Sequence, residues 1–307
     1  MKHLDDLNPE IVIMSGRALV HLHDKIILGL EVIKLKTLYV TDLDGTLLNT
    51  HDTINQKSID IINNLVEEGM KFTYATARSL VSASVVTKGL STNIPVITYN
   101  GSYIINPATN EILSSTEFTK EEADKVISVM KKYNISPLVY SYIDNVESVS
   151  WVTGKENDGM KRYLSLRKGD KRLRPLINDT KLYEGIMFYY TCIGEREELL
   201  QVYRAFADDD RYRCTIQQEL YRTEYWCEIM PKNATKAEAI LKLKKLWGCN
   251  NVISFGDAIN DIPMFQVSDE CYAVANAVPE LKKVATGVIG SNDEDGVSQW
   301  LKLYAKF

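Results

Sequence analysis

The sequence predicts an α/β protein in which a parallel sheet is interrupted by an inserted α+β domain. Near both ends of the chain, short β-rich runs alternate with helix-length segments, which is typical of βαβ units and a parallel sheet. Between them the apolar residues follow a period of two, which is typical of an antiparallel sheet with one solvated face. The length of 307 residues suits one large or two medium-sized domains.

The alternating parts contain recognisable strands and helices. Ile59, Ile62 and Val66 recur at helical spacing before Gly69, and a second helical stretch ends near Gly89. After Pro231 we expect a helix at 234–247 and a short helix following Asn260. The predicted strands of the parallel sheet are 37–41, 71–76, 95–99, 251–255 and 271–274.

The middle of the chain is richer in tyrosines and charges. We predict helices at 120–133 and 195–207, and longer strands at 138–143, 146–152, 182–193 and 225–230. These elements define three parts: an N-terminal extension at 1–34, a core at 35–112 and 231–307, and an inserted domain at 113–230. The crossings near Pro107 and Pro231 are expected to serve as hinges.

Composition excludes several classes of protein. A hydrophobic fraction of 45% rules out disorder, and 36 Lys and Arg against 41 Asp and Glu argue against nucleic-acid binding. No apolar run approaches the roughly 20 residues that cross a bilayer, so no membrane association is expected. The five cysteines form no C-x-x-C pair, which excludes a typical zinc site and makes the reducing cytoplasm the expected location.

Three predicted strands end in residues that suit phosphate and metal chemistry. Asp42 and Asp44 follow the first strand, Thr76 and Arg78 the second, and Asp257 and Asp261 a strand near the C-terminus. Ligands of open parallel sheets bind beyond the carboxyl ends of the strands, so these side chains should converge. An attacking carboxylate must be shielded from an anionic phosphate ester, and Mg²⁺ provides this with carboxylate ligands.

These motifs resemble those of the haloacid dehalogenase (HAD) superfamily, and specifically its Cof-type phosphatases. Asp42-Leu43-Asp44-Gly45-Thr46-Leu47-Leu48 is similar to motif I, Thr76 to motif II, Lys236 to motif III and 256–261 to motif IV. Asn100-Gly101 and the size of the insert also fit, and the likeness covers about 36–307. One departure is Ala77, where relatives usually have glycine. The resemblance implies a Rossmann-like core with a C2-type cap formed by the insert.

The resemblance also implies a role for each residue. Asp42 would be the nucleophile that forms an aspartyl-phosphate, and Asp44 the acid and base for the leaving group and water. Mg²⁺ would be held by Asp42, the backbone carbonyl of Asp44 and Asp257, with Asp261 supporting the metal or Lys236. The expected phosphate and substrate ligands are Thr76, the Ala77 backbone N–H, Arg78, Asn100, Lys236 and Asn260.

Other interpretations remain open at this stage. Lys236 is expected in the first turn of its helix, after an N-cap at Asn233, but it could also be an ordinary solvated lysine. The aspartates could serve turns and helix caps, and Thr76 could simply end a strand. Arg78 could be a surface arginine that caps a helix, and Asn100 could be a loop residue that faces away from the site. The main functional hypothesis is a Mg²⁺-dependent phosphatase for a small phosphorylated metabolite, working as a monomer or weak homodimer. A phosphomutase using the same site and a non-catalytic metabolite-binding module are the alternatives. The motifs do not identify the substrate.

The first 34 residues have no counterpart in the family pattern, which begins near Leu35 or Lys36. They are either an appendage or the product of a misassigned start. Leu35 would be a normal beginning if its codon were TTG. Glu31-Val32 can be encoded by a sequence that resembles a ribosome-binding site, so the gene's codons at these positions test this expectation.

Overall fold

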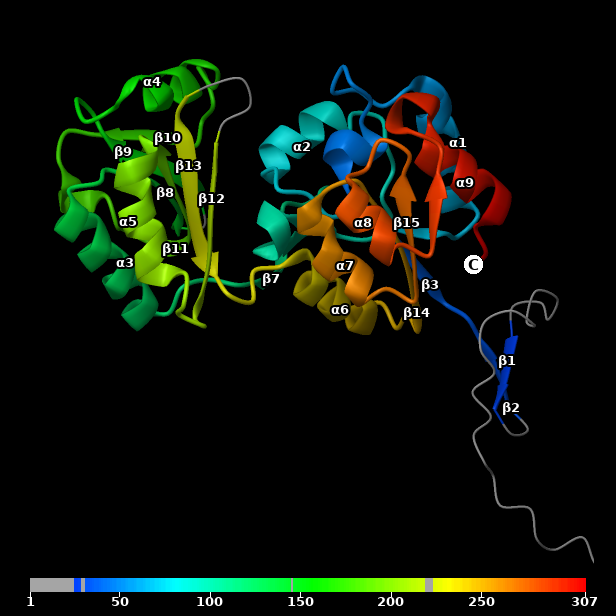
Figure 1. Ribbon diagram of the computed structural model, residues 1–307. Coiled ribbons are helices and arrows are strands. Elements are labelled where there is room, and N and C mark those ends of the chain that lie inside the picture. The colour runs from blue at the N-terminus through cyan, green and yellow to red at the C-terminus, as the bar shows by residue number, and fades with distance from the viewer. Residues whose placement is uncertain (1–24, 29–30, 145, 219–222) are drawn as a thin grey trace, which may run out of the picture.

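A computed structural model describes residues 25–28, 31–144, 146–218 and 223–307. Two large sheets, each with its own helices, lie at opposite sides of Figure 1. One sheet is five-stranded and parallel, and the other is six-stranded and mostly antiparallel. The predicted fold class is therefore confirmed: a parallel α/β core accompanied by an α+β unit.

The parallel sheet has the strand order β16-β15-β14-β3-β4. Its strands are β3 (Thr37–Thr41), β4 (Lys71–Tyr74), β14 (Asn251–Gly256), β15 (Glu270–Val274) and β16 (Gly287–Ile289). β3 is fully buried and lies between β14 and β4. This pairing brings the carboxyl ends of β3 and β14 side by side although they are far apart in sequence.

Helices cover both faces of the parallel sheet, as Figure 1 shows. Apolar side chains at helical spacing explain why α1 buries one face, with Ile59, Ile62 and Val66 in the core. α1 packs beside α9, while α6 packs beside α7. These helices are α1 (Gln56–Glu67), α2 (Leu80–Val86), α6 (Lys236–Leu246), α7 (Ile262–Gln266), α8 (Pro279–Val284) and α9 (Gly296–Tyr304).

A small antiparallel sheet connects the two large ones. It consists of β5 (Val96–Thr98), β6 (Tyr103–Ile105) and β7 (Ile112–Ser115), and a single parallel bridge between Ala75 and Ile97 joins it to the end of β4. Pro107 lies in the turn between β6 and β7. The expected hinge near Pro107 is therefore wrong, because the backbone there closes a hairpin.

The second large sheet has the order β10-β9-β8-β11-β13-β12. Its strands are β8 (Leu138–Ile143), β9 (Val146–Val152), β10 (Leu173–Leu176), β11 (Ile186–Gly194), β12 (Tyr212–Gln218) and β13 (Tyr225–Pro231). The accompanying helices are α3 (Lys120–Tyr133), α4 (Asp158–Ser165) and α5 (Arg196–Phe206). β10 pairs in parallel with β9, an exception to the expected antiparallel pattern.

The period-two pattern of these strands separates two packed faces. Val139, Tyr190 and Cys192 pack with apolar residues of α3 and α5. The opposite face is aromatic, and its Tyr140, Phe188 and Tyr189 pack with residues of the β5–β6 region. The second sheet is therefore joined to the core through an aromatic cluster.

At the N-terminus, β1 (Lys25–Leu28) pairs in antiparallel register with β2 (Glu31–Lys34). The remainder of the expected extension, 1–24 and 29–30, lies outside the described residues. Within the described ranges, no helix combines the length and the apolar character that a bilayer crossing needs.

Candidate active site

Four charged groups converge where β3 and β14 end. The main chain N–H of Asp42 donates to the carbonyl of Phe255 at 2.9 Å, which extends the strand pairing into the loops. Carboxylate oxygens of Asp42, Asp257 and Asp261 come within 4.8 Å of one another. Lys236, at the start of α6, reaches into the same cluster.

Lys236 pairs with two of these carboxylates. Its Nζ lies 2.6 Å from Asp42 Oδ1 and 2.8 Å from Asp261 Oδ1, and all three side chains are buried. The second oxygen of Asp261 accepts the backbone N–H groups of Asp257 and Ala258 at 3.0 and 3.1 Å. Asp261 is therefore fully partnered and fixes both the lysine and the loop after β14.

The loop after β3 brings Asp257 close to the motif I backbone. Gly45 has a φ of +73°, and a Cβ there would lie 2.4 Å from Asp257 Oδ2. Only glycine adopts this turn without strain and leaves room for the carboxylate. Thr46 Oγ1 donates to Asp257 Oδ1 at 2.9 Å, so the loop also orients that carboxylate.

The crowding of carboxylates changes their proton affinities. Burial raises the pKa of Asp42, and the Lys236 ammonium opposes this shift. Burial also raises the pKa of Asp257 to about 6, with a hydrogen bond from Thr46 opposing the rise and the charge of Asp261 adding to it. Burial alone would lower the pKa of Lys236, but the charges of Asp42 and Asp261 raise it. The lysine is therefore a fixed cation at neutral pH.

Asp44 is separate from the buried cluster and pairs with Arg78. The guanidinium Nε lies 3.0 Å from each carboxylate oxygen of Asp44. The Asp44 side chain is 46% exposed and that of Arg78 is 22% exposed, so both remain accessible to a ligand. Sequence reasoning assigned Arg78 to substrate and missed this pairing.

The other predicted site residues are placed differently. Thr76 is buried, and its hydroxyl accepts the N–H of Arg78 at 3.1 Å. Its carbonyl accepts the N–H of Asn100 at 2.9 Å, so Asn100 is held beside motif II. Ala77 is exposed and lines a cavity described below. Asn260 is also exposed, and no hydrogen bond in the described structure joins it to the cluster.

The expected helix cap before Lys236 is wrong. α6 begins at Lys236, and its N-cap is Thr235, whose side chain accepts the N–H of Glu238 at 3.1 Å. Asn233 instead accepts the N–H of Thr235 through its own carbonyl at 2.9 Å, within a turn that follows β13. Lys236 is therefore the first residue of the helix.

A cavity of about 220 Å³ lies next to this site. Ala77, Arg78 and Ser79 of the core contribute to its wall. The rest comes largely from the six-stranded sheet and its neighbours: Tyr140, Tyr163, Arg167, Arg172, Tyr189, Thr191, Trp226 and Glu228. The cavity contains both aromatic surface and charged groups, and Arg78 lies in its wall.

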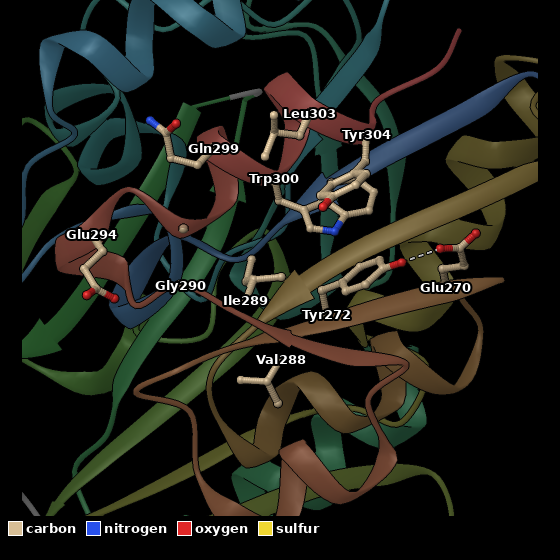
Figure 2. Close-up of a pocket in the computed structure, with 11 residues that line it drawn as sticks. Glu270, Tyr272, Val288, Ile289, Gly290, Glu294, Gln299, Trp300, Leu303 and Tyr304 are labelled. Atoms are coloured by element: carbon tan, nitrogen blue, oxygen red, sulfur yellow. Dashed lines mark hydrogen bonds between the residues drawn. The ribbon is translucent and has the colours of Figure 1, made fainter. Parts of the chain in front are cut away.

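A larger cavity, of about 600 Å³, runs along α9 and β16 (Figure 2). Tyr272 and Trp300 pack against each other there, with ring centroids 4.5 Å apart, and the Tyr272 hydroxyl donates to Glu270 at 2.5 Å. Among the residues that the structure describes, its lining contains Glu270 and Glu294 but neither lysine nor arginine. Such a wall would repel a phosphate ester, so size does not identify the catalytic site here.

Comparisons with known proteins agree with this geometry. A family model described as haloacid dehalogenase-like hydrolase matches residues 39–301. A 5-amino-6-(5-phospho-D-ribitylamino)uracil phosphatase of Bacillus subtilis is 23% identical, over 87% of this chain and 97% of the relative. A solved structure from Thermotoga maritima is 26% identical, with a TM-score of 0.71 over 88% of this chain and 98% of that one. A HAD subclass IIB sugar phosphatase has the same fold, with 21% identity and a TM-score of 0.65 over 87% and 98% of the chains.

Proposed function

Since the chain belongs to the haloacid dehalogenase-like hydrolase family, we propose that it is a Mg²⁺-dependent phosphatase for small phosphorylated metabolites. The observation that carries this proposal is the buried Asp42–Lys236–Asp261 group beside Asp257. A carboxylate next to a fixed cation suits nucleophilic attack on phosphorus. The phosphatase names of the relatives agree with a phosphoric monoester hydrolase.

The carboxylate cluster fits a hard divalent cation. Asp42 and Asp257 offer oxygen donors of the kind Mg²⁺ prefers, and Asp261 is already occupied by Lys236 and two backbone N–H groups. We therefore assign Asp42 and Asp257 as side-chain ligands and Asp261 as their support, with the Asp44 carbonyl as a further ligand. When bound, the metal would neutralise phosphate charge that otherwise repels the nucleophile.

In the proposed reaction, an oxygen of Asp42 attacks phosphorus and the bond from phosphorus to the leaving oxygen breaks. Asp44 donates a proton to that oxygen and then takes one from the water that cleaves the aspartyl-phosphate. Lys236 balances charge on Asp42 and the transferring group. Arg78 holds Asp44 in the structure, and a phosphate dianion offers its guanidinium an alternative partner.

We further propose that the chain divides as 35–112 and 231–307 for the core and 113–230 for the cap. The aromatic cluster between the sheets and the cavity beside Arg78 support this division. The cap would exclude water and contact the leaving group.

We also propose a cytoplasmic location, because five free cysteines suit a reducing compartment.

The test is phosphate release from a panel of sugar, nucleotide, flavin and pyridoxal phosphates, with Mg²⁺ or with EDTA. We expect metal-dependent release that Asp42→Asn abolishes and that Asp60→Asn, a control on the exposed face of α1, leaves unchanged. Release that survives Asp42→Asn would contradict the aspartyl-phosphate. Transfer of the phosphoryl group to a second hydroxyl of the sugar, without release, would point to a mutase.

A further inference from the structure

Two consecutive residues beside the site have left-handed backbone. Tyr99 has a φ of +50° and Asn100 a φ of +54°. Asparagine tolerates this region, but a bulky aromatic residue adopts it rarely and at a cost. The surrounding contacts must therefore impose this conformation on Tyr99.

Core contacts fix the backbone on both sides. The N–H of Tyr99 donates to the carbonyl of Arg78 at 3.0 Å, and that of Asn100 donates to Thr76 at 2.9 Å. The next residue, Gly101, has a φ of +107° and approaches the backbone of Thr235. A Cβ at Gly101 would lie 2.0 Å from the Thr235 carbonyl oxygen. The segment 99–101 therefore lies between motif II and the first residue of α6.

The hydroxyl of Tyr99 is held from the other side by the proposed cap. Arg172 Nη1 donates to this hydroxyl at 2.9 Å, and the hydroxyl itself donates to Glu147. Nη1 of Arg172 forms an ion pair with Glu147 at 2.6 Å, and the two side chains are only 12% and 11% exposed. Nη2 of Arg172 forms a second ion pair with Asp170, also at 2.6 Å. The Tyr99 ring packs edge-on against Phe188 of β11, with centroids 5.0 Å apart.

Asn100 is the residue that this arrangement orients. It is 6% exposed, and its Oδ1 has no hydrogen-bond partner in the described part of the chain. An unpartnered buried amide is costly unless a ligand completes it. Rotation of the amide by half a turn would present Nδ2, a donor, at the same place.

We propose that Tyr99 is a positioning residue: the cap's Arg172–Glu147 pair holds its hydroxyl, and this places the Asn100 amide for a hydrogen bond with the phosphoryl group. The inference rests on the proposed phosphatase function. It makes part of the catalytic power depend on an ion pair of the proposed cap that acts through Tyr99. Loss of the hydroxyl lets the left-handed segment relax and moves Asn100 away.

The test is a double-mutant cycle of Tyr99→Phe with Asn100→Ala. We expect Asn100→Ala to lower kcat/KM about tenfold, as loss of one hydrogen bond would, and Tyr99→Phe to lower it by a smaller factor. In the Asn100→Ala background, Tyr99→Phe should have no further effect. Arg172→Lys, which keeps the charge but not the paired geometry, should repeat this pattern.

Tyr103→Phe is the matched control, because Tyr103 belongs to the same aromatic cluster while its hydroxyl meets Glu117 instead. It should leave kcat/KM unchanged. Thermal unfolding of each variant separates loss of fold from loss of positioning. Equal effects of Tyr99→Phe in both backgrounds, or no effect in either, would overturn the proposal.

A binding readout separates this proposal from the phosphatase proposal. Calorimetric titration with inorganic phosphate in the presence of Mg²⁺ measures phosphate affinity for the same four proteins. We expect each single variant to bind phosphate more weakly than the wild type, and the double variant to bind it no more weakly than Asn100→Ala. If the wild type binds phosphate in this way but hydrolyses no ester, the proposed function fails and the positioning role stands. Additive losses in phosphate binding contradict the positioning role whatever the activity.

Discussion

At the scale of single residues, the site depends on carboxylates that repel one another. Asp257 shows the consequence most directly, because burial and its neighbours raise its pKa to about 6. A carboxyl with a raised pKa in the folded state favours folding in acid, and this contribution is lost as the pH rises from about 4 through about 6. A bound cation should offset this loss, because it takes the place of the proton.

We therefore expect MgCl₂ to raise the unfolding temperature more at about pH 8 than at about pH 5, where protons compete for Asp257. Thermal unfolding with and without Mg²⁺ across this range measures the effect. In Asp257→Asn, the Mg²⁺-induced rise should nearly vanish at both pH values. An equal rise at both pH values in the wild type would contradict Asp257 as a ligand.

Arg78 is expected to control substrate affinity. Arg78→Ala should raise KM by about ten- to a hundredfold, because a charge-assisted hydrogen bond to phosphate is lost. Arg78→Lys should recover part of this loss, since it restores the charge but not the planar fork. Steady-state kinetics on one substrate measures both, with exposed Arg204→Ala as the control. An unchanged KM in Arg78→Ala would mean that the guanidinium serves only Asp44.

The motifs and their spacing were enough to predict the residues of the buried cluster as candidate site residues, because each of them follows a strand or lies near the start of a helix. They could not predict the pairing of Arg78 with Asp44, which are 34 positions apart, or of Arg172 with Glu147, 25 positions apart. Such pairs depend on how loops approach in space. No local pattern in the sequence encodes that approach.

At the scale of elements, the segment 99–101 carries an unusual constraint. Gly101→Ala adds a Cβ to a left-handed residue and drives it into the Thr235 backbone. We expect a loss of about 2–4 kcal/mol in the free energy of unfolding, from strain plus overpacking. Gly154→Ala is the control, since the φ of Gly154 is +84° but no atom of the described ranges lies within 4 Å of the added Cβ.

The loss of unfolding free energy expected for Gly101→Ala corresponds to an unfolding temperature lower by roughly 4–16 °C. Gly154→Ala should lose only the contribution of backbone strain, about 1 kcal/mol. Calorimetry on both variants tests this difference. Equal shifts would show that the close approach at Thr235 relaxes without cost.

Several elements were predicted closely, whereas others, α4 and α9 among them, were missed. The strand expected at 95–99 forms β5, which lies in the small antiparallel sheet and not in the parallel one. α3, β8 and β9 have the predicted bounds. β10 and β12 form the two outer edges of the six-stranded sheet and bury less of their surface, so their polar and charged residues hide the strand pattern. The family assignment was predicted from its motifs and is confirmed by the family match.

At the scale of the whole molecule, selectivity should depend on the cavity between the two sheets. Its volume of about 220 Å³ suits a single ring better than a nucleoside. Trp226→Ala enlarges it, so we expect kcat/KM for nucleoside monophosphates to rise about tenfold relative to that for sugar phosphates. Trp247 lines a different cavity, so Trp247→Ala should leave the ratio unchanged. No change in the ratio for Trp226→Ala would place the leaving group outside this cavity.

The pairing of β3 with β14 also has a consequence for synthesis. β3 leaves the ribosome early, but its neighbour on one side is made only after the whole insert. Domains fold as units while they emerge, and long-range pairing is slow. The six-stranded unit can therefore fold while β3 still lacks its neighbouring strand β14. A second contact of the same kind joins β3 to a residue made after β14: the Tyr39 hydroxyl donates to the carbonyl of Lys306 at 3.0 Å and accepts its N–H at 2.8 Å.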